Sequence, residues 1–171
     1  MQRRLNGAPE IADCLARGAR LFNEGSYFAA HEEWEQGWLL VRGGEKRLLQ
    51  GLIQVAAACF KLQQGKPTGM VRLLAKAQRH LRAADAETRL VDVGSLLEAI
   101  TWWSAYGSEL VRSSRTAYDP ARLPRVALAA GDGGVSGPPP VDFSDRLAVA
   151  TREGLPTMRP GPTRRHPECL R

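Results

Sequence analysis

The sequence lacks a long apolar stretch, and it lacks cysteines arranged in pairs. Its longest uninterrupted apolar run, VAAACF at residues 55–60, is far shorter than the roughly 20 residues with which a helix spans a bilayer, so we expect no membrane segment. The three cysteines, Cys14, Cys59 and Cys169, are odd in number and show no CxxC spacing. Neither a disulfide framework nor a zinc knuckle is therefore indicated. Reduced thiols, and an N-terminus without an apolar stretch of signal-peptide length, predict a cytoplasmic protein.

Recognised catalytic motifs are missing too, because the chain contains no GxSxG turn, no Walker loop and no GxGxxG turn. The formal net charge is +6, which allows anionic partners. The basic residues are spread out, however, and form no like-charged block of roughly five or six residues. The clearest basic surface, formed by Arg72, Lys76 and Arg79 on one side of an expected helix, is typical of a solvated face. Nucleic acid is therefore the least favoured partner.

Proline divides the chain into two parts. All but two of the eleven prolines, Pro9 and Pro67, follow Asp119, and they crowd the segments GDGGVSGPPP (131–140) and PTMRPGPTRRHP (156–167). Such segments continue neither a helix nor a central strand. The composition predicts a helical domain over residues 1–117 and a Pro/Gly/Arg-rich tail, largely irregular or disordered, over residues 118–171.

The tail is expected to hold one short helix over residues 144–153, with Ser144 as its N-cap. It also has apolar residues that could pack against the helical domain, namely Leu123, Val126, Leu128, Phe143 and Leu147.

The first part of the chain predicts an all-α fold, an antiparallel bundle of about five helices with short joints marked by glycine and proline. Ser26 is suited to be the N-cap of the second helix. Gly25, Tyr27 and Ala30 resemble the turn and second helix of a tetratricopeptide-type hairpin, although no second copy follows at a fixed period. The expected helices cover residues 9–23, 26–42, 45–64, 67–86 and 92–113.

The stretch FNEGSYFAAHEEWEQGW at residues 22–38 concentrates two tryptophans, a tyrosine, two phenylalanines, a histidine and four glutamates. On a helix that turns about 100° per residue, Glu35 lies about 40° from His31 on the same side. We expect both side chains inside the aromatic sector formed by Tyr27, Trp34 and Trp38. Burying a carboxylate costs several kcal/mol unless it is paired, and a histidine one turn away is a natural partner.

Two interpretations of this pair stay open. In the first, His31 and Glu35 form a structural pair that fixes helix packing. In the second, both are ligands of a divalent metal, because side chains at i and i+4 can reach one cation, and Glu32 adds a ligand or acts as a catalytic base. HEEWE is not the HExxH zinc-protease motif, since position 35 is glutamate, so further donors have to come from another helix.

The expected helix 45–64 could supply those donors. Its residues Arg47, Gln50, Gln54 and Lys61 fall in one narrow sector, which is either the wet face of a surface helix or a polar partner of His31. Gly51 and the alanines nearby indicate a close helix contact, so a glutamine could orient His31 or complete a polar pocket. The opposite, apolar side of the helix is formed by Leu48, Leu52, Val55, Ala56 and Cys59.

FNEGSYFAAHEEWEQGW followed by LLQGLIQVAAACFKLQQGKPTGMVRLLAKA resembles the bacterial and archaeal domain-of-unknown-function family 309. The resemblance covers roughly residues 15–82 and is carried by the motif pair HExWE and QGLIQxAAA. It implies an all-helical fold in which the two helices face each other and share a polar cluster. Some collections describe such proteins as predicted metal-dependent hydrolases. The residues that the resemblance singles out are His31, Glu32, Trp34, Glu35, Trp38, Gln50, Gly51 and Gln54.

The sequence as a whole favours a binding or scaffold module, because no complete catalytic set is present. The expected ligand is a small molecule or a peptide, and a homodimer is possible. The alternative is a metal-dependent hydrolase in which His31 and Glu35 hold the metal and Glu32 is catalytic. A nucleic-acid-associated protein ranks third. The expected binding pocket is lined by Tyr27, His31, Trp34, Glu35, Trp38, Gln50 and Gln54.

Overall fold

Five α-helices make up most of the described structure. The structure is a computed structural model that describes residues 7–85, 90–120 and 123–128 of the 171-residue chain. The predicted all-α fold is confirmed, and each helix begins and ends within two residues of its expected bounds. The helices are α1 (Gly7–Asn23), α2 (Tyr27–Leu40), α3 (Gly43–Gln63), α4 (Pro67–Asp85) and α5 (Val93–Arg112).

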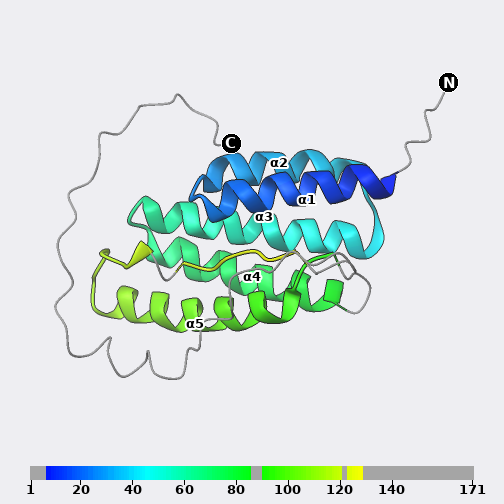
Figure 1. Cartoon of the computed structure of the whole chain (residues 1–171). Coiled ribbons are helices and arrows are strands. Elements are labelled where there is room, and N and C mark those ends of the chain that lie inside the picture. The colour runs from blue at the N-terminus through cyan, green and yellow to red at the C-terminus, as the bar shows by residue number, and fades with distance from the viewer. Residues whose placement is uncertain (1–6, 86–89, 121–122, 129–171) are drawn as a thin grey trace.

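Each helix packs chiefly against its neighbours in sequence, so that α1 to α5 form a series of antiparallel hairpins with α3 in the middle (Figure 1). The turns between α1 and α2 and between α3 and α4 are built alike. Gly25 and Gly65 both adopt positive φ angles, of 84° and 69°. In both turns the next residue donates its N–H to a carbonyl five residues back, from Ser26 to Leu21 and from Lys66 to Lys61, each at 2.9 Å. This is the hydrogen bond of a Schellman cap, which favours glycine at the left-handed position.

The core lies between these hairpins and is centred on α3. All five residues predicted for the apolar side of α3 are buried, which confirms that assignment. Trp34 of α2 and Trp103 of α5 are the two largest fully buried side chains. Gly51 of α3 lies against Leu81, so the close contact expected at Gly51 is made with α4 and not with α2.

The starts of α2 and α5 are stabilised differently. Asp92 caps α5, because its Oδ1 accepts a hydrogen bond from the Ser95 N–H at 3.1 Å. Ser26 occupies the corresponding position before α2, as predicted, but its side chain makes no capping hydrogen bond. Only its backbone carbonyl takes part, accepting from the Ala30 N–H at 2.9 Å.

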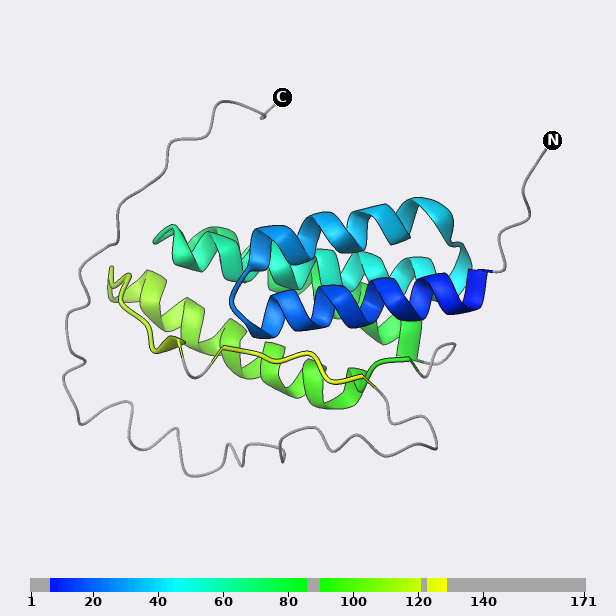
Figure 2. The same ribbon diagram turned by 45° about the horizontal axis from the view of Figure 1, so that its top comes forward.

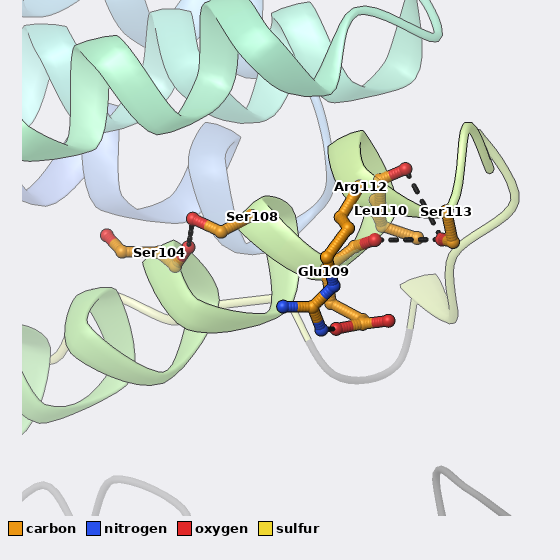
Figure 3. Close-up of polar contacts among 6 residues, drawn as sticks. All are labelled: Ser104, Ser108, Glu109, Leu110, Arg112 and Ser113. Carbon is orange, nitrogen blue, oxygen red and sulfur yellow. Dashed lines mark hydrogen bonds and ion pairs between the residues drawn. The ribbon is translucent and has the colours of Figure 1, made fainter.

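The last turns of α5 carry local polar contacts (Figure 3). The Ser108 hydroxyl donates to the Ser104 carbonyl, and the Ser113 hydroxyl donates to the Glu109 carbonyl, both at 2.8 Å. Arg112 forms an ion pair with Glu109 one turn away. The Glu109 carbonyl also accepts from the Ser113 backbone N–H at 2.9 Å, so the Ser113 hydroxyl adds a second hydrogen bond to a carbonyl that is already paired.

Beyond α5 the chain turns and runs back along the bundle, and in Figure 2 its yellow trace lies between α1 and α5. Ser114, at the turn, has a φ of 53°, in the left-handed region that is uncommon for a residue other than glycine. The returning chain reaches the start of α5, where Leu128 forms an isolated antiparallel bridge with Val91. Val126 is buried, with an exposed fraction of 3%.

The predicted tail is therefore described only in part. Val126 and the partly buried Leu123 pack against the core, whereas Leu128 is exposed. Phe143, Leu147 and the expected helix over residues 144–153 lie outside the described residues. The division of the chain at residues 117 and 118 stays a prediction. In the described part of the chain, none of the helices has both the length and the apolar character needed to cross a bilayer.

Candidate functional site

The predicted His31–Glu35 pair forms on the surface of α2. His31 Nδ1 lies 3.6 Å from Glu35 Oε2, and the two side chains are 27% and 54% exposed. The expectation that Glu35 lies inside the buried aromatic sector is therefore wrong. The buried side of α2 includes Ala30 and Gly37, two small residues whose positions turn the helix so that Glu35 faces outward.

Ala30 and Gly37 are the signal that sequence reasoning missed. A Cβ atom at Gly37 would lie 2.6 Å from the Sγ of Cys14, so α2 lies close against α1 at this residue. Small residues at such a contact can mark the buried side of a helix as strongly as large apolar ones. In α2 they share that side with Tyr27 and Trp34.

Tyr27 and Trp34 consequently belong to the core and do not line an open pocket. Their exposed fractions are 5% and 0%, and both rings contact Phe22, with centroid distances of 4.9 Å and 5.8 Å. Burial raises the pKa of the Tyr27 hydroxyl above its ordinary value. Neither side chain can reach a ligand on the surface unless the helices separate.

An aromatic contact joins α2 and α3 beside His31. The Phe28 ring stacks on the His31 imidazole, with centroids 6.4 Å apart and planes inclined by 4°. Phe28 also contacts Phe60 of α3 at 5.6 Å, yet Phe28 itself is 54% exposed. The histidine and the exposed phenylalanine therefore form one continuous surface that extends onto α3.

Trp38 lies one helical turn beyond Glu35. It is partly buried, and the Lys46 ammonium of α3 lies 4.0 Å from the centroid of its ring. This cation–π contact is a second link between α2 and α3, and contacts of this kind contribute about 0.5–1 kcal/mol when exposed.

The predicted glutamines of α3, Gln50 and Gln54, are partly exposed. Within the described residues, Gln54 Oε1 and His31 Nδ1 are buried atoms that have no hydrogen-bond partner. The hydrogen bond by which Gln54 could orient His31 is therefore not formed, and Gln50 remains at the partly exposed surface of α3. A buried polar atom without a partner costs about 1–3 kcal/mol, which is offset when water or a ligand supplies one.

The other glutamates of α2 have different roles. Glu33 forms an ion pair with Arg17 of α1, with 2.7 Å between Arg17 Nη2 and Glu33 Oε1. The Cys14 thiol donates a hydrogen bond to the Glu33 backbone carbonyl at 3.2 Å. Glu32 is exposed. Glu33 is thus part of the α1–α2 contact, whereas Glu32 and Glu35 face outward.

Metal binding at this site would require several donor side chains close together. Within residues 7–85, 90–120 and 123–128, no three or more His, Cys, Asp or Glu side chains are grouped so that they could hold a metal ion. His31 and Glu35 are two donors on one helical face, whereas catalytic zinc sites usually have three protein ligands.

Comparison with known proteins confirms the resemblance found in the sequence. Residues 15–73 match the family described as Domain of unknown function (DUF309). This range includes the His31–Glu35 pair as well as Gln50 and Gln54 of α3. The family description assigns no activity.

One relative is a protein of Aquifex aeolicus (strain VF5) described as an uncharacterized protein, and it is 26% identical to this chain over 95 residues. The match covers 55% of this chain and 28% of the relative. The chain therefore spans less than a third of the length of that relative. Function has to be argued from the geometry of this chain.

Proposed function

We propose that this protein is a binding module that holds a partner segment on the outer side of α2. The observation that carries the proposal is the exposure of large hydrophobic side chains on α2. Five large hydrophobic side chains are exposed among the described residues, and three of them belong to α2: Phe28 at 54%, Leu39 at 71% and Leu40 at 65%. Single exposed apolar residues are ordinary, but several gathered on one short helix favour an interaction site.

The pattern of these residues suggests the chemistry of the partner. Phe28, Glu32, Glu35 and Leu39 are spaced so that they share one side of the helix, and we call these four residues the α2 outer face. Its two apolar ends are about 16 Å apart, because an α-helix rises 1.5 Å per residue. Between them are two exposed carboxylates, since Arg17 engages only Glu33.

An amphipathic helix with two apolar side chains about three turns apart, and lysine or arginine between them, complements this face. A second copy of the chain fits less well. In a symmetric antiparallel pair of α2 helices that matches Phe28 with Leu39, Glu32 of each copy would face Glu35 of the other, and like charges opposed in an interface cost several kcal/mol.

The proposal is tested with a designed helical peptide that carries leucines eleven positions apart and two lysines between them. Binding of the fluorescein-labelled peptide to the full chain is followed by fluorescence anisotropy. Phe28→Ala and Leu39→Ala are each expected to lower the affinity by about tenfold, because truncating an apolar anchor commonly removes more than 1 kcal/mol. Glu35→Lys is expected to weaken binding further at low salt.

Val111→Ala is the matched control, because Val111 is 42% exposed but belongs to α5. A peptide in which glutamates replace the lysines controls for charge. If Val111→Ala weakens binding as much as Phe28→Ala does, or if both peptides bind alike, the α2 outer face is not the binding site.

The second candidate function is a metal-dependent hydrolase. The observation in its favour is the 3.6 Å distance between His31 Nδ1 and Glu35 Oε2, which brings two potential ligands together at the surface. In this proposal Glu32 is the general base, and any further ligand comes from substrate or water. It ranks below the binding module because only two donors converge.

A cytoplasmic location is also part of the proposal. Cys14 and Cys59 are both buried free thiols, which is the usual state of cysteine in a reducing compartment.

A further inference from the structure

The first two helical hairpins repeat one backbone pattern at an interval of 40 residues. Four backbone N–H groups close each turn, and the donors are Glu24, Gly25, Ser26 and Ala30 in the first hairpin and Gln64, Gly65, Lys66 and Met70 in the second. The carbonyls that accept from them keep the same interval, and they belong to Arg20, Phe22, Leu21 and Ser26 and to Phe60, Leu62, Lys61 and Lys66. Residues of α2 can therefore be compared one by one with residues of α4.

The packing of α2 and α4 keeps this interval. The buried residues Ala30, Trp34 and Gly37 of α2 have buried counterparts in Met70, Leu74 and Ala77 of α4. The helix that follows also contacts matching residues. Trp38 contacts Lys46 of α3, and its counterpart Gln78 donates a hydrogen bond to Thr101 of α5 at 3.1 Å. The two hairpins thus share one structural plan, of the kind that helical repeat proteins stack.

His31 and Val71 occupy the same position in this plan but differ in chemistry. Val71 packs against α5, since a Cβ atom at Gly107 would lie 2.8 Å from its Cγ2. His31 is partly buried too, so it places a polar ring where α4 has an apolar side chain. Within the described residues its Nδ1 is buried and has no hydrogen-bond partner. Packing alone is satisfied by valine at this position, and His31 adds the cost of an unsatisfied polar atom.

The side chains around His31 indicate which group would use this nitrogen. Glu35 Oε2 lies 3.6 Å from Nδ1, too far for a hydrogen bond but close enough for one donor group to reach both atoms. The Phe28 ring stacks on the imidazole. Phe28 and Glu35 are both more than half exposed, so either side chain can move aside and open Nδ1 to a partner. Departures of this kind from a fold's own pattern are expected at functional sites.

From this comparison we infer that His31 determines the specificity of the α2 outer face, because His31 Nδ1 and the Glu35 carboxylate together bind the ammonium group of a lysine of the partner helix. Nδ1 accepts one hydrogen bond, with the ring proton on Nε2, and Glu35 accepts another. An exposed ion pair with Glu35 alone contributes little, whereas the imidazole adds a directed acceptor that selects an ammonium group over an apolar side chain. The inference rests on the proposed function, because the lysine belongs to the helix bound there.

The test uses the helical peptide with two leucines and two lysines, and two versions in which one lysine is replaced by norleucine. Norleucine keeps the carbon stem and lacks the ammonium group, and testing both lysines makes the direction of the bound peptide irrelevant. In the wild-type chain, the more damaging replacement is expected to lower the affinity by about tenfold, because charge-assisted hydrogen bonds are lost. In His31→Val the same replacement should cost about threefold or less, because only Glu35 remains.

Two further variants serve as controls. An asparagine amide places an oxygen near the position of Nδ1, so His31→Asn should keep most of the tenfold effect. His80→Val removes a partly buried histidine of α4, outside the α2 outer face, and should bind all three peptides as the wild type does. An equal loss in the wild type and in His31→Val would overturn the inference and leave the proposed function intact. No binding of the lysine peptide to the wild-type chain would remove the α2 outer face as a site, and the inference with it.

Urea denaturation tests the structural comparison without any peptide. His31→Val introduces the residue that α4 has at this position and removes the buried Nδ1, so it is expected to raise the urea midpoint by about 0.5 M. The reverse exchange, Val71→His, should lower the midpoint, because it places a polar ring against α5. A His31→Val chain that is less stable than the wild type, or does not fold, would show that His31 is needed for packing, and this result would also overturn the inference.

Discussion

The indole of Trp34 lies directly against the backbone of Gly18, so that α1 and α2 approach each other more closely than any larger residue at position 18 would allow. A methyl group at Gly18 would overlap the indole nitrogen of Trp34. Trp34 is fully buried, so it has little freedom to move away.

Gly18→Ala should therefore destabilise the protein, although alanine is the better helix former by about 1 kcal/mol. Overpacking of a filled core costs about 1–3 kcal/mol, and we expect a net loss in the free energy of unfolding measured by urea denaturation. Gly94→Ala is the matched control, because its new Cβ would lie at an ordinary 3.6 Å from Asp92 Oδ1. A Gly18→Ala chain as stable as Gly94→Ala would contradict this account of the α1–α2 contact.

The helices could be predicted from the sequence because their information is local. Apolar residues at helical spacing, with Gly25 and Pro67 at the joints, gave bounds close to those observed. The rotation of α2 was predicted less well. A helical wheel interpreted mainly from its large aromatic residues placed Glu35 on the buried side of α2. In the structure, the small residues Ala30 and Gly37 lie on that side instead.

Long-range contacts could not be predicted from the sequence, for a different reason. The pairing of Asn23 with Val126 joins residues 103 positions apart, and it uses backbone groups that every residue has. The likeness of the turns at Gly25 and Gly65 was also missed, because the two hairpins share a hydrogen-bond pattern and a glycine but little other sequence.

The stability of the protein should fall as the solution becomes alkaline. Burial raises the pKa of the Cys59 thiol, and burial together with Glu33 raises the pKa of the Cys14 thiol. In the unfolded chain the thiol pKa values are about 8.5. The folded chain therefore keeps these protons at a pH where the unfolded chain releases them. The free energy of unfolding is thus expected to be insensitive to these thiols below about pH 8 and to fall as pH rises above it, by at most about 1.4 kcal/mol per pH unit for each thiol.

Melting temperatures measured between pH 7 and pH 10 check this prediction. Cys59→Ala removes one of the two thiols and should make the alkaline decline shallower. Val111→Ala changes no titratable group, so its curve should run parallel to that of the wild type. A decline in Cys59→Ala as steep as in the wild type would show that this thiol does not contribute.

Metal binding separates the two candidate functions of α2. His31 and Glu35 supply two donors, whereas stable zinc sites use three or four protein ligands, so we expect no metal at one equivalent per chain. Wild type and His31→Ala are dialysed against trace zinc, manganese and iron, then passed through gel filtration and measured by elemental analysis. His80→Ala is the matched control, because it removes a different partly buried histidine, which lies on α4.

The expected result is the same low metal content in all three proteins. His31→Ala should lower the free energy of unfolding by no more than about 1 kcal/mol, since an ion pair with partners this exposed contributes little. One metal per chain in the wild type and in His80→Ala, lost in His31→Ala while circular dichroism stays unchanged, would contradict the prediction. The hydrolase would then be the better account of the His31–Glu35 pair, because a tightly held ion requires ligands beyond these two side chains.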